Sequence, residues 1–148
     1  MSKADKAKEL FLSGFSCSQS VFCAFADELN IDIETAQMLS SSFGGGMGRL
    51  REVCGTVSGA LMVLGAKYGY TSKNPEKKAE HYKRVQRFAE LFKKNTGSII
   101  CRELLGLKKG EDTGFVPSRR TDEYYKKRPC PELVYLAAKI LEEDFNSV

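Results

Sequence analysis

The segment SSFGGGMGRLREVCGTVSGALMVLGAKYG, residues 41 to 69, is the feature that most constrains the fold. Four of the five positions from 44 to 48 are glycine, and such a cluster ends a helix because glycine readily adopts backbone conformations that other residues avoid. The apolar run that follows contains Gly55 and Gly59, each of which costs about 1 kcal/mol relative to alanine in a helix. The segment therefore predicts a glycine turn, then a helix beginning near Cys54 that closely approaches another backbone or a cofactor.

The remaining sequence predicts helices separated by local start and stop signals. Asn74 followed by Pro75 is typical of a helix start, and Gly97 is typical of a helix end. Apolar side chains recur at helical spacing between such signals. We expect helices over residues 2–14, 16–29, 32–43, 54–69, 74–97, 98–106 and 131–145.

Residues 107–129 contain glycine, proline and charge clusters, and we expect them to form a long, mostly irregular connection. No segment shows the alternating pattern of a strand, and no internal repeat is present. The sequence thus predicts an all-α fold: a single-domain bundle of about six or seven helices spanning residues 1–148, with a long loop before the last helix.

Composition and charge exclude several classes of protein. No apolar run reaches the roughly 20 residues of a membrane-spanning helix, and the charged N-terminus lacks the apolar core of a secretory signal. We therefore expect a cytoplasmic protein without membrane insertion.

Residues 73–130 contain 16 Lys and Arg against 8 Asp and Glu, a net +8. We interpret this charge as solvated helix faces and expect no specific nucleic-acid binding, since no such motif is present. The sequence does not indicate an oligomeric state.

Cysteine is the residue type that points to chemistry. In a reducing compartment, cysteines indicate metal binding or redox chemistry rather than structural disulfides. The chain has no CxxC motif, and its five cysteines are Cys17, Cys23, Cys54, Cys101 and Cys130. All except Cys23 fall at predicted helix starts, where unpaired N–H groups and the helix dipole favour a thiolate. Cys23 lies between apolar residues inside a predicted helix and is expected in the core.

Cys54 is predicted to be the most easily ionised of these thiols. It opens the helix that follows the glycine turn, and Arg49 and Arg51 bring positive charge nearby, although Glu52 acts against them. His81, the one histidine, lies among charged residues and is expected to be solvated, which argues against a Cys–His hydrolase.

The glycines around Cys54 are candidates for contact with a cofactor. GGGMGR resembles a phosphate-binding loop but matches neither of the common nucleotide-binding glycine motifs, so a turn between two helices is the better-supported interpretation. The candidate cofactor-binding positions are Gly44, Gly45, Gly46, Gly48, Gly55 and Gly59.

The motifs FSCSQSVFCAF, FGGGMG, CGTVSGALMVLGAKYG, CRELLG and CPELV resemble, in this order, the C_GCAxxG_C_C family of small proteins described as redox-active. The resemblance spans nearly the whole chain. It implies that the characteristic cysteines are Cys17, Cys54, Cys101 and Cys130, with Cys23 extra to the pattern. Thr56 stands where the family usually has alanine.

Three functional hypotheses follow. In the first, these four cysteines converge on one electron-transfer or metal site, as ligands of an iron–sulfur cluster or of zinc, and the protein has a redox partner protein. In the second, the protein is a metal-free thiol–disulfide oxidoreductase in which Cys54 pairs with Cys101 or Cys130. In the third, it is a non-enzymatic module that binds a metal or a small anion. The sequence does not distinguish among these three hypotheses, and it does not decide whether the protein is an enzyme.

Overall fold

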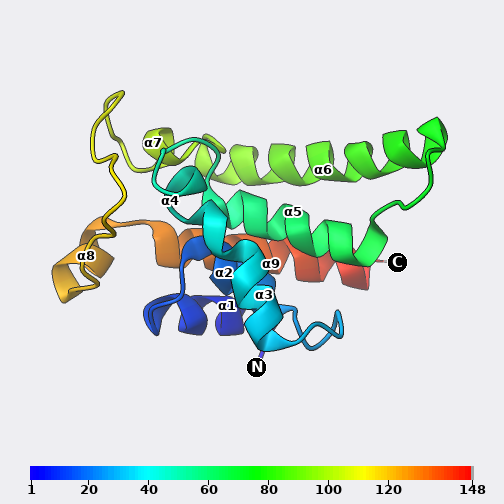
Figure 1. Ribbon diagram of the computed structural model, residues 1–148, viewed down its shortest axis with the longest axis horizontal. Coiled ribbons are helices and arrows are strands. Elements are labelled where there is room, and N and C mark those ends of the chain that lie inside the picture. Colours follow the sequence, from blue (N-terminus) through cyan, green and yellow to red (C-terminus); the bar gives the residue numbers. More distant parts are fainter. Residues whose placement is uncertain (148) are drawn as a thin grey trace.

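The computed structural model describes residues 1–147, and they form a helical bundle (Figure 1). Its elements are α1 (Lys3–Leu12), α2 (Cys17–Ala24), α3 (Ile33–Ser40), the 3-10 helix η1 (Ser41–Phe43), α4 (Gly44–Met47), α5 (Gly55–Tyr68), α6 (Pro75–Thr96), α7 (Cys101–Leu104), α8 (Asp122–Lys127) and α9 (Cys130–Asn146). Over these 147 residues there is no strand, only one isolated antiparallel bridge between Val53 and Ile100. The all-α prediction is confirmed, with more short helices than the six or seven expected.

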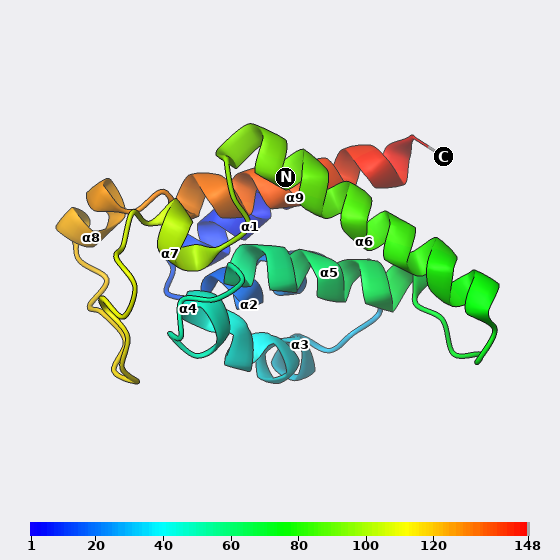
Figure 2. The same ribbon diagram turned by 90° about the horizontal axis from the view of Figure 1, so that it is seen from above.

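The core lies between five helices. α1 packs along α9 and α2 packs along α5, while the long α6 lies across α5 and α9 (Figures 1 and 2). The largest fully buried side chains include Phe11 of α1, Phe92 of α6, and Leu64 and Leu141 of α5 and α9. Both views place α4, α7 and the first residues of α5 and α9 at the same end of the bundle. No helix in the described part of the chain has the length and apolar content needed to cross a membrane.

Local signals set several helix ends as predicted. The Ser2 side chain accepts a hydrogen bond from the backbone N–H of Asp5 and caps α1. Asn74 caps α6 by accepting from the N–H of Glu76, and Gly97 ends that helix with a φ of 96°. These ends are set by the residues at the ends themselves, which is why the sequence was sufficient to find them.

Two predicted elements differ from the structure. The helix expected over residues 16–29 ends at Ala24, because Phe25 and Ala26 are buried in a turn that ends with Asn30 in a left-handed conformation. The connection over residues 107–129 is not wholly irregular, since it contains α8, whose first turn is capped by the side chain of Thr121.

His81 differs from its expected solvated position. Its side chain lies on α6 and is only 8% exposed, and Nδ1 has no hydrogen-bond partner among residues 1–147. The ring of Tyr70 covers it edge-on, with 5.9 Å between ring centroids. Charged neighbours in the sequence did not reveal this contact, because Tyr70 belongs to the connection before the helix.

Candidate functional site

Four of the five cysteines begin helices in the structure. Cys17, Cys101 and Cys130 are the first residues of α2, α7 and α9, and Cys54 is the N-cap of α5. All four line one cavity of about 300 Å³. Cys54 and Cys101 are buried, whereas Cys17 and Cys130 are partly exposed. Cys23, in contrast, is fully buried in the core and does not line this cavity.

Backbone hydrogen bonds hold Cys54 and Cys101 side by side. The N–H of Cys54 donates to the carbonyl of Ile99 at 2.8 Å, and the N–H of Cys101 donates to the carbonyl of Glu52 at 2.6 Å. Between these two bonds lies the bridge from Val53 to Ile100. The starts of α5 and α7, far apart in the sequence, are thereby fixed together.

The glycine turn brings Cys101 close to the chain before α5. Residues 45 to 49 all have positive φ, so the segment labelled α4 turns in the left-handed sense that glycine tolerates best. At Gly46, whose φ is 72°, a Cβ atom would lie 2.7 Å from the Cβ of Cys101. Any larger residue there would displace Cys101.

The glycines of α5 permit two further close approaches. A Cβ on Gly55 would lie 2.6 Å from Sγ of Cys17 and 2.5 Å from the carbonyl oxygen of Phe43. A Cβ on Gly59 would lie 2.6 Å from the carbonyl oxygen of Ser18, so this glycine serves the packing of α5 against α2. The candidate glycines that line the cavity are Gly44, Gly45, Gly48 and Gly55, whereas Gly46 and Gly59 do not line it.

A buried arginine contacts one of the thiols. Nη1 of Arg51, whose side chain is 7% exposed, donates to Sγ of Cys101 at 3.6 Å. Its Nη2 binds Oδ2 of Asp112 at 3.2 Å, and its Nε donates to the Asp112 carbonyl at 2.9 Å. Asp112 also binds Arg49 and Arg128, each at 2.8 Å. One carboxylate thus gathers three arginines, which leaves a net positive charge beside the thiols.

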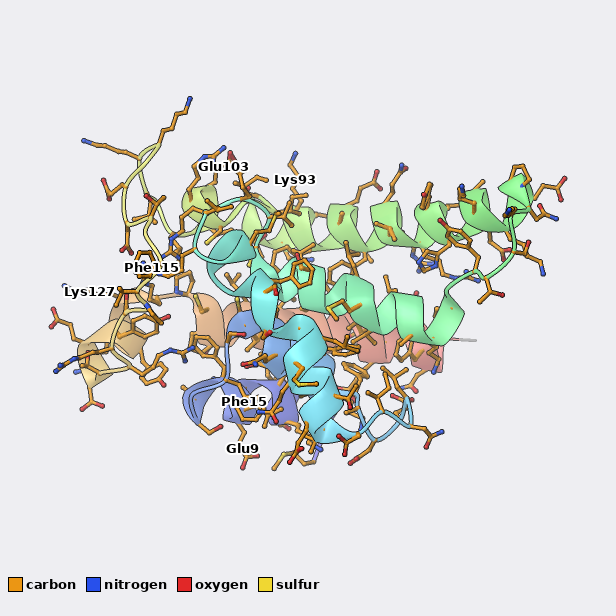
Figure 3. All side chains as sticks on the ribbon, in the orientation of Figure 1. Glu9, Phe15, Lys93, Glu103, Phe115 and Lys127 are labelled. Atoms are coloured by element: carbon orange, nitrogen blue, oxygen red, sulfur yellow. The ribbon has the colours of Figure 1, made fainter. Side chains whose placement is uncertain are left out.

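The connection over residues 107–129 forms one wall of the cavity. Besides Asp112, it supplies Arg120, whose two terminal nitrogens donate to the carbonyls of Phe11 and Phe15 at 2.9 and 3.0 Å. The same guanidinium lies 4.2 Å from the centre of the Phe11 ring. Phe115 also lines the cavity, from the projecting part of this connection (Figure 3). Sequence reasoning identified Arg49 and Arg51 but missed Asp112, Arg120 and Arg128, which gave no local signal.

Cys54, Cys101 and Cys130 are harder to ionise than expected. Burial, and then the neighbouring Cys17, raise the pKa of Cys54 above its ordinary value. The same two causes raise the pKa of Cys130 to about 12. Burial also raises the pKa of Cys101, although Arg51 acts against it. The prediction that Cys54 is the most easily ionised thiol is wrong, because the helix start does not compensate for burial.

Four cysteine thiols are the residue type that binds zinc as well as iron–sulfur clusters. A tetrahedral zinc site has metal–sulfur bonds of ~2.3 Å, which requires sulfurs about 3.8 Å apart. Within residues 1–147, no group of three or more His, Cys, Asp or Glu side chains could hold a metal ion in this way. The four thiols instead surround a cavity of about 300 Å³. Four cysteine thiolates are also the ligand set of [2Fe–2S] and [4Fe–4S] clusters.

Fold and site together define an all-helical protein with a four-thiol, arginine-rich cavity at one end of its bundle. Comparison with known families gives a match over residues 15–144 to the family described as "Putative redox-active protein (C_GCAxxG_C_C)", and the chain belongs to this family. Searches of curated proteins and of solved structures found no match.

Proposed function

We propose that Cys17, Cys54, Cys101 and Cys130 hold an iron–sulfur cluster and that the protein transfers single electrons between partner proteins. The observation that carries this proposal is that four thiols, contributed by four separate helix starts, line one cavity. Four thiolates are the usual ligand set of [2Fe–2S] and [4Fe–4S] clusters. When bound, such a cluster supplies a site that gains and loses one electron without breaking a bond.

The charges around the cavity support this assignment. A cluster with four thiolate ligands is an anion, and burying an anion requires compensating positive charge. The N-termini of α5 and α9 contribute partial positive charge through their unpaired N–H groups. Arg51 and Arg128 add full charges, held in place by Asp112.

The raised pKa values weigh against metal-free thiol chemistry. A thiol–disulfide oxidoreductase needs a thiolate at neutral pH, and its reactive cysteines are exposed and have lowered pKa values. Here burial raises the pKa of Cys130 to about 12 and also that of Cys54. Metal ligation removes the proton by direct bonding to the sulfur, so a raised thiol pKa is compatible with a ligand role.

The proposed electron partners are one-electron donor and acceptor proteins that approach the partly exposed side of the cavity. Cys17 and Cys130 lie on that side, and the connection over residues 107–129 borders it. One electron enters from the donor and one leaves to the acceptor, with no change in covalent bonds of the chain. All five cysteines are free thiols, and on this proposal the protein works in a reducing compartment.

The decisive experiment is purification without oxygen, followed by iron and sulfide analysis, visible absorption and electron paramagnetic resonance. We expect iron and acid-labile sulfide with visible bands. Serine variants of the four cavity cysteines should lose most of the iron. The matched control is Cys23→Ser, which exchanges a cysteine outside the cavity and should keep the iron. Bound zinc, or metal-free protein in which two thiols form a disulfide on mild oxidation, would overturn the proposal.

A further inference from the structure

Arg51 is a charged side chain held in a costly position beside the thiols. Its backbone has a φ of 62°, in the left-handed region that residues other than glycine rarely adopt. Its side chain is only 7% exposed. Backbone strain of this kind persists only where the surrounding structure enforces it, and it is found most often at functional sites. The strain and the burial of a full charge therefore require an explanation.

Three hydrogen bonds fix the direction of the Arg51 guanidinium. Nε donates to the carbonyl oxygen of Asp112 at 2.9 Å and Nη2 donates to its Oδ2 at 3.2 Å, while Nη1 donates to Sγ of Cys101 at 3.6 Å. The backbone holds the same two segments together, because the N–H of Cys101 donates to the carbonyl oxygen of Glu52 at 2.6 Å. Arg51 is therefore held between the Asp112 carboxylate and the Cys101 sulfur.

The charges around this contact do not balance in the thiol form. Asp112 also binds Arg49 and Arg128, so one carboxylate faces three arginines. Of these three, Arg51 is the one that also donates to a cysteine sulfur within residues 1–147. A neutral thiol is a weak acceptor, whereas a thiolate accepts a charge-assisted hydrogen bond. The contact is therefore strongest when Cys101 has lost its proton, as a metal ligand does.

We propose that Arg51 donates to the Cys101 sulfur in the cluster-bound protein and raises the reduction potential of the site, and that Asp112 is the positioning residue that holds Arg51 there. The inference rests on the proposed function. Reduction adds one electron and increases the negative charge on the ligand sulfurs, so a positively charged donor stabilises the reduced state more than the oxidised state. Asp112 belongs to the connection over residues 107–129, which projects beyond the end of the bundle (Figures 1 and 2). The potential thus depends on this connection remaining in contact with the glycine turn.

The first test compares Arg51→Gln with Arg49→Gln. Each variant removes one positive charge bound to Asp112, but within residues 1–147 only Arg51 contacts a cysteine sulfur. In the cluster-bound protein, the ratio of reduced to oxidised site at a fixed ambient potential should fall about tenfold in Arg51→Gln, which corresponds to about 59 mV for one electron. In Arg49→Gln the ratio should fall by no more than about threefold. Equal shifts in the two variants would overturn the inference.

Asp112→Ala provides a test in which a positioning role and a simple charge effect differ in sign. The variant removes both carboxylate oxygens that bind the arginines. If Asp112 acted only as a nearby negative charge, its removal would raise the potential. If it holds Arg51 on Cys101, its removal releases Arg51, and the ratio of reduced to oxidised site should fall about threefold. An unchanged or raised potential would overturn the inference, and this holds even if Arg51→Gln binds no iron.

A last measurement separates this inference from the proposed function. If the parent protein binds no cluster, the proposed function fails, but the contact of Arg51 with Cys101 remains testable in a double-mutant cycle by urea unfolding of the cluster-free protein. For Arg51→Gln combined with Cys101→Ala, the unfolding constant should rise about threefold less than the product of the two single effects. The control is Arg51→Gln combined with Cys23→Ala, outside the cavity, for which the effects should multiply. Multiplying effects at Cys101 would overturn the inference whether or not a cluster binds.

Discussion

Replacing Gly59 by alanine should destabilise the protein, whereas the same replacement at Gly65 should stabilise it. Both residues lie in α5. A Cβ at position 59 would lie 2.6 Å from the carbonyl oxygen of Ser18 and 3.1 Å from its Cα, while a Cβ at position 65 meets nothing within 4 Å. Both variants make the same change from glycine to alanine. Comparing their stabilities therefore separates the effect of helix propensity from the effect of helix packing.

The expected magnitudes follow from two opposing effects. Alanine gains about 1 kcal/mol over glycine in a helix. At Gly65 this gain is unopposed. At Gly59 the new methyl group meets backbone, which cannot rotate away, so α2 and α5 must separate by several tenths of an ångström. Overpacking of this kind costs about 1–3 kcal/mol, and for a backbone contact we take the upper part of that range. The net loss at Gly59 should be about 1–2 kcal/mol.

Urea unfolding of reduced, cluster-free protein, followed by far-ultraviolet circular dichroism, measures both effects. In thermal melts the shift should be about 2–4 °C per kcal/mol, downward for Gly59→Ala and upward for Gly65→Ala. Ser18 follows Cys17 in α2, so Gly59→Ala should also reduce iron binding while Gly65→Ala preserves it. If both variants are stabilised equally, α2 and α5 are not in close contact at Gly59 and the packing described above is incorrect.

Three further predictions concern charge and burial. Although burial opposes them, hydrogen bonds from arginine side chains hold the pKa of Asp112 below its usual range. The carboxylate therefore stabilises the fold at neutral pH, and Asp112→Asn should be less stable there, with the difference in urea midpoints vanishing as the pH falls through the native pKa. Burial raises the pKa of Cys23 to about 11, so the native state holds this proton longer than the unfolded state. Stability should consequently fall above about pH 8.5, by about 1–2 kcal/mol at about pH 10, and Cys23→Ser should lack this part of the loss in urea titrations. In cluster-free protein, mass spectrometry after brief alkylation should find Cys17 modified before Cys54, because Cys17 is partly exposed and Cys54 is buried; the reverse order would contradict the described burial.

Local chemistry in the sequence was sufficient to predict most of the helices. Caps such as Ser2 and Asn74 act on backbone groups two or three residues away, so their effect can be read without knowing the fold. The end of α2 could not be predicted in this way. Apolar residues continue at helical spacing past Ala24, but the burial of Phe25 in a turn depends on packing against other elements.

The candidate site was predictable only in part, for the same reason. The cysteines were found because residue type and helix start coincide in the sequence. The contact of Arg51 with Asp112 joins residues 61 positions apart, and no pattern near either residue indicates it. Asp112 is one of four acidic residues in this basic connection, and nothing in the sequence set it apart from the other three. Its role became visible only when the connection was placed against the glycine turn.

The failed expectation for Cys54 shows which effect is larger at this site. A helix N-terminus favours a nearby negative charge by about 0.3–1 kcal/mol at an exposed position, up to about 2 kcal/mol when partly buried. Burying a thiolate without a counter-charge costs more. Cys54 is only 6% exposed, and burial therefore raises its pKa despite the helix start. On our proposal, the same features suit a ligand. The thiol stays protonated and unreactive in the cluster-free protein, while the helix start stabilises the sulfur once iron replaces the proton.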